Sequence, residues 1–187
     1  KRLVKKKSDF VFPSELDVSW IKNISKPNLV KPKLLYVGRL KVEKGIFSLF
    51  KIFEEMDKDF ELSIVGKNEN SKFNEKKFNF LGFGFNSSEL IKIYDNHNIS
   101  ILPSFTEAHP KVLDESLARA RPVIIFEEIS HVVQNRKGVF ISRRDSQSLT
   151  ETIKFIMGNY LSIQDSMSKN ILPMKKDFIS QITNILD

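Results

Sequence analysis

Two glutamates, Glu107 and Glu115, stand eight positions apart around the expected start of a helix. The apolar run 99–102 before them is typical of a short buried strand, and Pro110 has the fixed φ and missing N–H that suit a first helical position. Glu107 then lies in the strand-to-helix loop. Glu115 lies about one and a half turns into the helix, at roughly 3.6 residues per turn.

The start of this helix predicts an anion site between the two carboxylates. The amides near Lys111 and Val112 have no intrahelical partners, and the helix dipole makes this end positive. Carboxylates beside a bound phosphate would repel it unless each accepts hydrogen bonds from neutral hydroxyls, such as those of a ribose and a sugar. The expected ligand is therefore a nucleotide-sugar.

A second polar loop, residues 38–45, follows the apolar run 33–37, which has the character of a buried parallel strand. In this loop Arg39 offers a planar fork of donors and Lys44 a mobile point charge, and together they could neutralise a diphosphate. Lysine and arginine are abundant in the chain, so composition by itself favours ordinary solvated surface for either side chain.

Strand-like runs alternate with helical patterns along most of the chain. Helical spacing begins at Ile46, Asn86 and Glu89 form a capping box, and Asp145 is placed to cap a later helix. The alternation predicts an α/β fold, a Rossmann-like three-layer αβα sandwich with a mostly parallel sheet that binds ligands at the carboxyl ends of its strands. The expected strands are 33–37, 62–65, 78–81, 99–102, 123–126 and 139–141.

The chain is long enough for one core, since it has 187 residues of which 41% are hydrophobic. Residues 1–32 are less regular and are punctuated by Pro27 and Pro32, so we predict a connector or hinge remnant there. Residues 33–187 are predicted to form one nucleotide-sugar-binding domain that includes the C-terminal helices.

Several motifs fall in the order and spacing of a known family. Over roughly residues 33–157 the chain resembles the C-terminal half of the family-4, or group 1, retaining glycosyltransferases of the GT-B fold. The residues that carry this resemblance are Gly38-Arg39-Leu40 with Lys44-Gly45, Leu62-Ser63-Ile64-Val65-Gly66, Phe80-Leu81-Gly82, Leu102-Pro103-Ser104, Glu107, Pro110, Glu115 and Pro122-Val123-Ile124.

The resemblance implies that Arg39 and Lys44 bind the donor diphosphate beside Gly38, that Glu107 touches the transferred sugar, and that Glu115 bonds the ribose. It implies catalytic roles for Arg39, Lys44 and Glu107, and a metal-independent reaction that retains anomeric configuration. The donor would be a UDP- or GDP-sugar, with no cofactor.

The donor site would also include residues 109–112 and the loop after the third strand. The resemblance places the base at residues 82–85, where Phe83 or Phe85 would flank it. His109 has two interpretations: it bonds a phosphate or sugar hydroxyl, or it is only a helix-boundary residue. Asp114 is expected to face solvent.

The chain departs from the family pattern at positions where similar sequences carry glycine. Ala108 follows the first glutamate, Ala120-Arg121 precedes the Pro-Val-Ile strand, and Lys67-Asn68-Glu69 follows Gly66. Residues 127–131, Glu-Glu-Ile-Ser-His, replace a Gly-Gly pair that faces the donor phosphates. We expect altered donor geometry there, because close backbone approach favours glycine.

Composition narrows the remaining classes of function. The net charge of +7, with Lys1-Arg2 and Lys5-Lys6-Lys7 at the start, could attract an anionic membrane leaflet or be ordinary solvated surface; no aromatic-interleaved groove or motif favours nucleic acid. The chain has no cysteine and its three histidines lack ligand spacing, so we expect no metal site. Neither a membrane-spanning run nor a leader is evident, so we expect a cytoplasmic location, with peripheral attachment to the inner face of the membrane as an option.

Three hypotheses follow. The first is the donor-binding domain of a glycosyltransferase that builds cell-envelope polysaccharide on a glycan or lipid-linked acceptor, inactive without an N-terminal acceptor domain. The second is a non-catalytic nucleotide-sugar-binding module, and the third is a basic domain that binds nucleic acid or a membrane surface. Turnover by the full-length protein separates the first two, and salt-dependent binding would favour the third.

Overall fold

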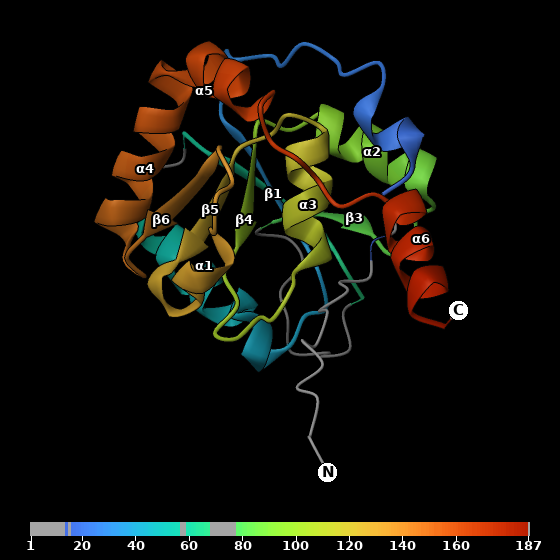
Figure 1. Cartoon of the computed structure of the whole chain (residues 1–187). Coiled ribbons are helices and arrows are strands. Elements are labelled where there is room, and N and C mark those ends of the chain that lie inside the picture. Colours follow the sequence, from blue (N-terminus) through green and yellow to red (C-terminus); the bar gives the residue numbers. More distant parts are fainter. Residues whose placement is uncertain (1–13, 15, 57–58, 68–77, 187) are drawn as a thin grey trace.

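The computed structural model describes residues 14, 16–56, 59–67 and 78–186. The basic start at Lys1–Lys7 and most of the Lys67-Asn68-Glu69 departure lie outside these residues. Within them the chain forms one parallel sheet covered by helices on both faces (Figure 1). The predicted Rossmann-like α/β fold is therefore confirmed.

All neighbouring strands of the described sheet pair in parallel, in the order β3-β2-β1-β4-β5-β6. Each strand lies within a few residues of an expected apolar run. Their bounds are β1 Lys33–Val37, β2 Glu61–Val65, β3 Asn79–Gly82, β4 Ile99–Leu102, β5 Val123–Phe126 and β6 Val139–Ser142.

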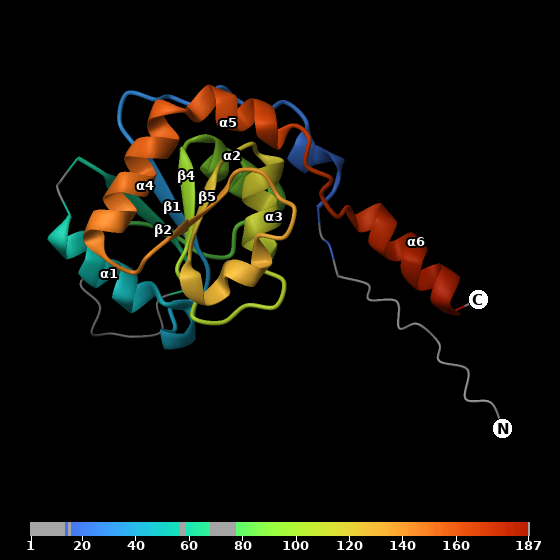
Figure 2. The ribbon, with the colours of Figure 1, turned by 60° about the vertical axis from the view of Figure 1, so that its left-hand side comes forward.

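The helices divide between the two faces of the sheet (Figure 2). One face carries α1 and α4 and the other carries α2 and α3. The α-helices are α1 Ile46–Glu55, α2 Ser87–Asp95, α3 Lys111–Ala118, α4 Ser146–Gly158, α5 Tyr160–Met167 and α6 Lys175–Leu186, and the 3₁₀ helices are η1 Val18–Ile21, η2 Val42–Lys44 and η4 Glu127–Val132.

The period-2 alternation of β1 explains how both faces are filled. Leu34 and Tyr36 point into the core formed with α1 and α4, whereas Leu35 joins the core formed with α2 and η1. All three side chains are almost completely buried. A parallel strand covered on both faces has this continuous apolar character, so the apolar pattern predicted it correctly.

Local capping signals define where several helices begin. Asn86 and Glu89 form the predicted capping box of α2, and Asp145 caps α4 by accepting a hydrogen bond from the Ser148 amide at 2.7 Å. The predicted position of Pro110 is wrong by one residue. Pro110 has an extended ψ of 112° and precedes the helix, which begins at Lys111.

Part of the segment before β1 packs against the domain. Leu16 and Trp20 are 3% exposed, and the buried guanidinium of Arg119 donates hydrogen bonds to the carbonyls of Trp20, Lys22 and Asn23. These bonds attach the segment to the end of α3. The predicted domain boundary at residue 32 stays a prediction.

At the other end of the chain, α6 extends away from the sheet and its covering helices (Figure 2). No helix in the described ranges is both long and apolar enough to cross a membrane.

Candidate functional site

The two polar loops of the sequence meet where the strand order changes direction. β1 pairs with β4, with Leu34 opposite Ile99, although β2, β3 and the α-helices α1 and α2 lie between the two strands along the chain. The loop after β1 continues into η2 and α1, and the loop after β4 continues into α3. Such a switch point, at the carboxyl ends of parallel strands, is where open α/β sheets bind ligands.

A cavity of about 310 Å³ opens between these two loops. It brings together side chains and backbone from both loops and from the first turn of α3. The predicted site residues that line it are Gly38, Arg39, Lys44, Glu107, His109, Pro110, Lys111 and Val112.

Lys44 and Glu107 are direct partners across this cavity. Lys44 Nζ donates to Glu107 Oε1 at 2.5 Å, and the same oxygen accepts a hydrogen bond of 2.7 Å from Ser104 Oγ. Ser104 is fully buried, and the Lys44 and Glu107 side chains are 23% and 11% exposed. The lysine predicted to be a mobile charge is thus held against the carboxylate predicted to touch the sugar.

Tyr36 supports the loop that carries Arg39. Its buried hydroxyl donates a hydrogen bond of 2.7 Å to the Arg39 carbonyl, while the Arg39 side chain is exposed. Burial raises the pKa of Tyr36 well above its usual value, and the nearby charge of Glu107 raises it further. The hydroxyl therefore stays protonated and remains a donor at neutral pH.

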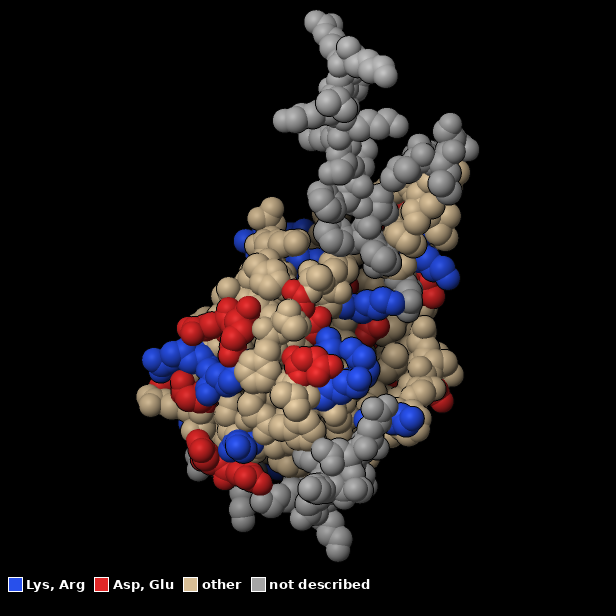
Figure 3. All heavy atoms as spheres, turned by 90° about the horizontal axis from the view of Figure 1, so that it is seen from below, with Lys and Arg blue, Asp and Glu red and all other residues tan. Residues whose placement is uncertain are grey.

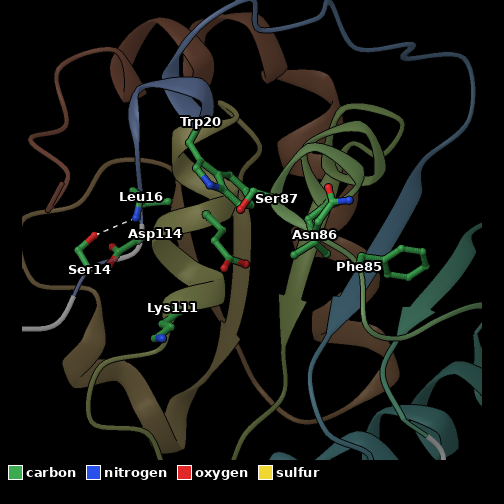
Figure 4. A pocket seen from close by; sticks show the side chains of 10 residues that line it. Ser14, Leu16, Trp20, Phe85, Asn86, Ser87, Lys111 and Asp114 are labelled. Carbon is green, nitrogen blue, oxygen red and sulfur yellow. Dashed lines mark hydrogen bonds between the residues drawn. The ribbon is translucent and has the colours of Figure 1, made fainter. Parts of the chain in front are cut away.

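Glu115 lies in a separate, adjoining cavity of about 320 Å³. Lys111 lines both this cavity and the one that contains Glu107, so the two spaces meet at the first turn of α3. Figure 4 shows Trp20 across one end of the cavity and Lys111 at the start of the helix.

Phe83 lies beside a third hollow, of about 270 Å³, which it shares with Gly38 and Arg39. Its side chain is 61% exposed. Phe85 lines both this hollow and the cavity of Glu115. The loop 82–85 thus borders the space that adjoins both Arg39 and Glu115.

The start of α3 points toward the first cavity, because Pro110, Lys111 and Val112 all line it. Pro110, the residue that directly precedes this helix, makes no capping hydrogen bond through its side chain. Helix starts of this kind attract anions through their amides and the helix dipole.

The prediction that Asp114 faces solvent is wrong. Asp114 is 4% exposed and lies between His109 Nε2, 3.0 Å from its Oδ2, and Arg136 Nε, 3.3 Å from its Oδ1. Burial raises the pKa of Asp114, whereas Arg136 and His109 oppose that rise. Asp114 lines the cavity that contains Glu115, and its contact with His109 holds that ring beside the cavity of Glu107.

The segment 127–131, which replaces a Gly-Gly pair, forms the 3₁₀ helix η4. Glu128 Oε1 accepts a hydrogen bond of 2.7 Å from Arg144 Nε, which lowers the pKa of Glu128. Arg144 also stacks over the rings of Phe105 and Phe126, at 4.2 and 4.4 Å from their centroids. His131 Nε2 lies 2.7 Å from the Glu107 carbonyl. The segment therefore braces the loop that carries Glu107.

Sequence patterns missed three residues that the structure places at the site. Trp20 and Tyr94 lie around Glu115, and Ser104 binds Glu107. Trp20 is the only tryptophan of the chain, and Ser104 belongs to the Leu102-Pro103-Ser104 motif at the end of β4, which were the available signals. For Tyr94 no local signal existed, because its role depends on the packing of α2 against α3.

Figure 3 shows the molecule from below, from the side where the carboxyl ends of the strands carry these loops. Where described side chains are visible, basic and acidic groups alternate across this face. Among the same described residues, no group of three or more histidine and acidic side chains could hold a metal ion.

Comparison with known proteins is consistent with this geometry. The family model described as "Glycosyl transferases group 1" matches residues 31–159. A relative from Staphylococcus aureus, the capsular polysaccharide biosynthesis glycosyltransferase CapM, is 29% identical over 149 residues, which cover 72% of this chain and 39% of the relative. An uncharacterized glycosyltransferase from Haemophilus influenzae is 26% identical over 169 residues, covering 76% of this chain and 48% of the relative. The chain therefore spans less than half the length of these relatives.

Solved structures share the fold. Sucrose-phosphate synthase from Thermosynechococcus elongatus is similar with a TM-score of 0.67 and 18% identity, over 85% of this chain and 45% of that one. HepE of Anabaena in complex with UDP is similar with a TM-score of 0.63 and 16% identity, over 83% of this chain and 48% of that one. HepE has also been solved with UDP and glucose.

Proposed function

The chain belongs to the group 1 glycosyl transferases, and from this premise we propose that it is the part of such an enzyme that binds the nucleotide-sugar donor. The observation that carries the proposal is the meeting of the Arg39–Lys44 loop and the Glu107 loop at the start of α3, with Glu115 in the adjoining cavity. One elongated ligand could occupy both spaces. Its diphosphate would lie near Lys111, which lines both of them.

Each part of a nucleoside diphosphate sugar has a matching chemistry in these cavities. Arg39, Lys44 and the first amides of α3 would hold the diphosphate. Glu115 would accept hydrogen bonds from the ribose hydroxyls, and Glu107 would accept them from the transferred sugar. The base would then lie toward the loop 82–85, beside Phe83 or Phe85.

The chemical step needs stabilisation of the charge that develops on the departing diphosphate. Preorganised cations and amides do this without reorganising in the transition state. Lys44 is already held by Glu107, whose carboxylate also accepts a hydrogen bond from Ser104, so the ammonium group is preorganised beside the cavity. We propose that the transfer is metal-independent and retains the anomeric configuration.

The acceptor site would lie on another domain, since the chain spans less than half of its relatives. The acceptor would be a glycan or a lipid-linked glycan. A role in cell-envelope polysaccharide synthesis is supported by the capsular polysaccharide enzyme among the relatives. A cytoplasmic location with peripheral attachment to the membrane stays a prediction.

Calorimetric titration with UDP, GDP and the corresponding nucleosides tests the proposal. Glu115→Gln should weaken diphosphate binding by about 1 to 3 kcal/mol, because hydrogen bonds to a charged acceptor are lost. Glu151→Gln, on the exposed side of α4, is the control with the same change of charge. The proposal would be contradicted if the wild-type protein bound neither UDP nor GDP, or if Glu115→Gln bound the diphosphate as tightly as the wild type.

A second candidate, a nucleotide-sugar-binding module without transfer activity, has one specific observation in its favour. Where related enzymes present a Gly-Gly backbone to the donor phosphates, this chain has η4 with Glu127 and Glu128. Glu128 is neutralised by Arg144, which reduces its repulsion of a phosphate and favours the enzyme over the binding module. Turnover by the full-length protein separates the two.

A further inference from the structure

Tyr94 lies directly behind Glu115. Its side chain is completely buried on α2, and its hydroxyl donates a hydrogen bond of 2.8 Å to Glu115 Oε2 on α3. A buried tyrosine hydroxyl needs a partner, and here the partner is the carboxylate that lines the cavity. The hydrogen bond therefore links the position of α2 to the orientation of one site residue.

A carboxylate that binds two neighbouring hydroxyls must present its oxygens at a defined angle. It has about four acceptor positions on two oxygens, and the bond from Tyr94 uses one of them. That bond restricts rotation of the carboxyl group about χ3, the last side-chain torsion, whose values are otherwise broadly distributed in glutamate. Burial and the charge of Glu115 raise the pKa of Tyr94, so its hydroxyl remains a donor.

The ring of Tyr94 is itself fixed from the other side. Trp20 packs edge-on against it, with ring centroids 5.8 Å apart at 67°. Arg119 donates to the Trp20 carbonyl at 2.9 Å and to both carboxylate oxygens of Asp95, the residue after Tyr94. Figure 4 shows Trp20 at the wall of the cavity, close to α3. The segment before β1 thus contributes to the geometry around Glu115.

We propose that Tyr94 is a positioning residue for ribose recognition, because its hydroxyl orients the Glu115 carboxylate toward the two ring hydroxyls of the bound nucleotide. This inference rests on the proposed donor-binding function. It differs from a purely structural role for Tyr94, which would affect folding but not the discrimination between ribose and deoxyribose.

Tyr94→Phe tests the inference, since it keeps the ring and its packing and removes only the donor. The probes are UDP and 2′,3′-dideoxy-UDP, or the guanosine pair where the wild type prefers GDP, with affinities measured by calorimetry. We expect UDP binding to weaken about three- to tenfold, as for loss of one net hydrogen bond. Binding of the dideoxy analogue should stay unchanged. Equal weakening of both ligands, or no weakening of either, would overturn the inference.

Tyr160→Phe is the matched control. The Tyr160 hydroxyl is also buried and donates a hydrogen bond of 2.6 Å, to the Asn98 carbonyl, but none of the three cavities around Glu107, Glu115 and Phe83 includes it. This variant loses a comparable buried hydrogen bond and should keep the wild-type ratio of UDP to dideoxy-UDP affinity. A changed ratio in Tyr160→Phe would show that the assay reports stability, and would overturn the inference.

A second variant covers the case in which Tyr94→Phe does not fold. Glu115→Asp keeps the charge but withdraws the carboxylate from Tyr94, so it should also lose the preference for UDP; full preference in this variant would overturn the inference. The two proposals fail differently. If Glu115→Gln loses the preference while Tyr94→Phe keeps it, only the role of Tyr94 is wrong. If the wild type binds neither UDP nor GDP, the donor-binding function itself is wrong.

Discussion

Gly45 packs against Pro103 so closely that a Cβ on Gly45 would lie 1.8 Å from the Pro103 carbonyl oxygen. Gly45 also has a left-handed backbone, with φ of 65°. It directly follows Lys44, and Pro103 directly follows β4 and leads toward Glu107. This contact therefore sets how closely the two halves of the site approach each other.

Gly45→Ala should destabilise the protein and weaken diphosphate binding. The left-handed backbone alone costs a side chain about 1 to 2 kcal/mol, and the clash with a backbone oxygen adds to it. Gly84→Ala is the control, because Gly84 has a φ of 79° but open space around its Cβ position. Urea unfolding of both variants measures the difference, and equal losses of stability would show that the contact with Pro103 does not matter.

Arg39→Ala combined with Lys44→Ala should abolish the preference for UDP over uridine. The charge-assisted hydrogen bonds of these side chains would go to phosphate oxygens and not to the base or ribose. A Lys92→Ala, Lys154→Ala protein loses the same charge from exposed positions on α2 and α4 and serves as the control. If calorimetry finds the wild-type preference in the Arg39, Lys44 double variant, the diphosphate binds elsewhere.

The 187-residue chain should show no sugar transfer by itself, and the full-length enzyme should depend on Glu107. In the full-length enzyme, Glu107→Ala should lower kcat by on the order of a hundredfold, as for loss of one transition-state contact, and change nucleotide affinity less. Glu43→Ala, an exposed carboxylate in the neighbouring loop, should behave as wild type. Steady transfer by the isolated chain, or a full-length Glu107→Ala enzyme with the wild-type rate, would argue against the assignment.

Ala120→Gly should stabilise the protein by about 1 kcal/mol. Ala120 follows the end of α3 with a φ of 51°, a left-handed conformation that glycine adopts without strain. Ala118→Gly, at the last residue of the same helix, should have the opposite effect because glycine is a poor helix former. The two denaturation midpoints measure this contrast, and a lower midpoint for Ala120→Gly would disprove the explanation.

His97 should make the protein less stable in mild acid. Burial lowers the pKa of His97, and its Nδ1 lies 2.6 Å from the Ile93 carbonyl. The unfolded chain takes up a proton below about pH 6.5, whereas the folded protein resists it. The contribution to stability is therefore complete above that pH and decreases as the pH falls toward the lowered folded value. His97→Asn should flatten the curve of unfolding free energy against pH between 7 and 5; an unchanged slope would exclude this role.

The sequence alone determined the fold class and the residues of the two loops. Apolar runs bounded by turn residues predict strands, and short caps such as Asn86 with Glu89 act within one helical turn, so neither depends on distant parts of the chain. The resemblance of spaced motifs to a family selected Arg39, Lys44, Glu107 and Glu115 together. These features depend on residues close together in the sequence or on the order of motifs along the chain, so the amino-acid sequence is sufficient to show them.

Tertiary structure decided the contacts between those residues. The sequence pattern did not predict that Lys44 pairs with Glu107, 63 positions away, because that contact depends on β1 lying beside β4. The burial of Asp114 and the bond from Tyr94 to Glu115 likewise depend on how α2, α3 and the segment before β1 pack. Helical spacing assigns a residue to a face of its own helix, but only the packed neighbours determine whether that face meets solvent, a partner or a ligand.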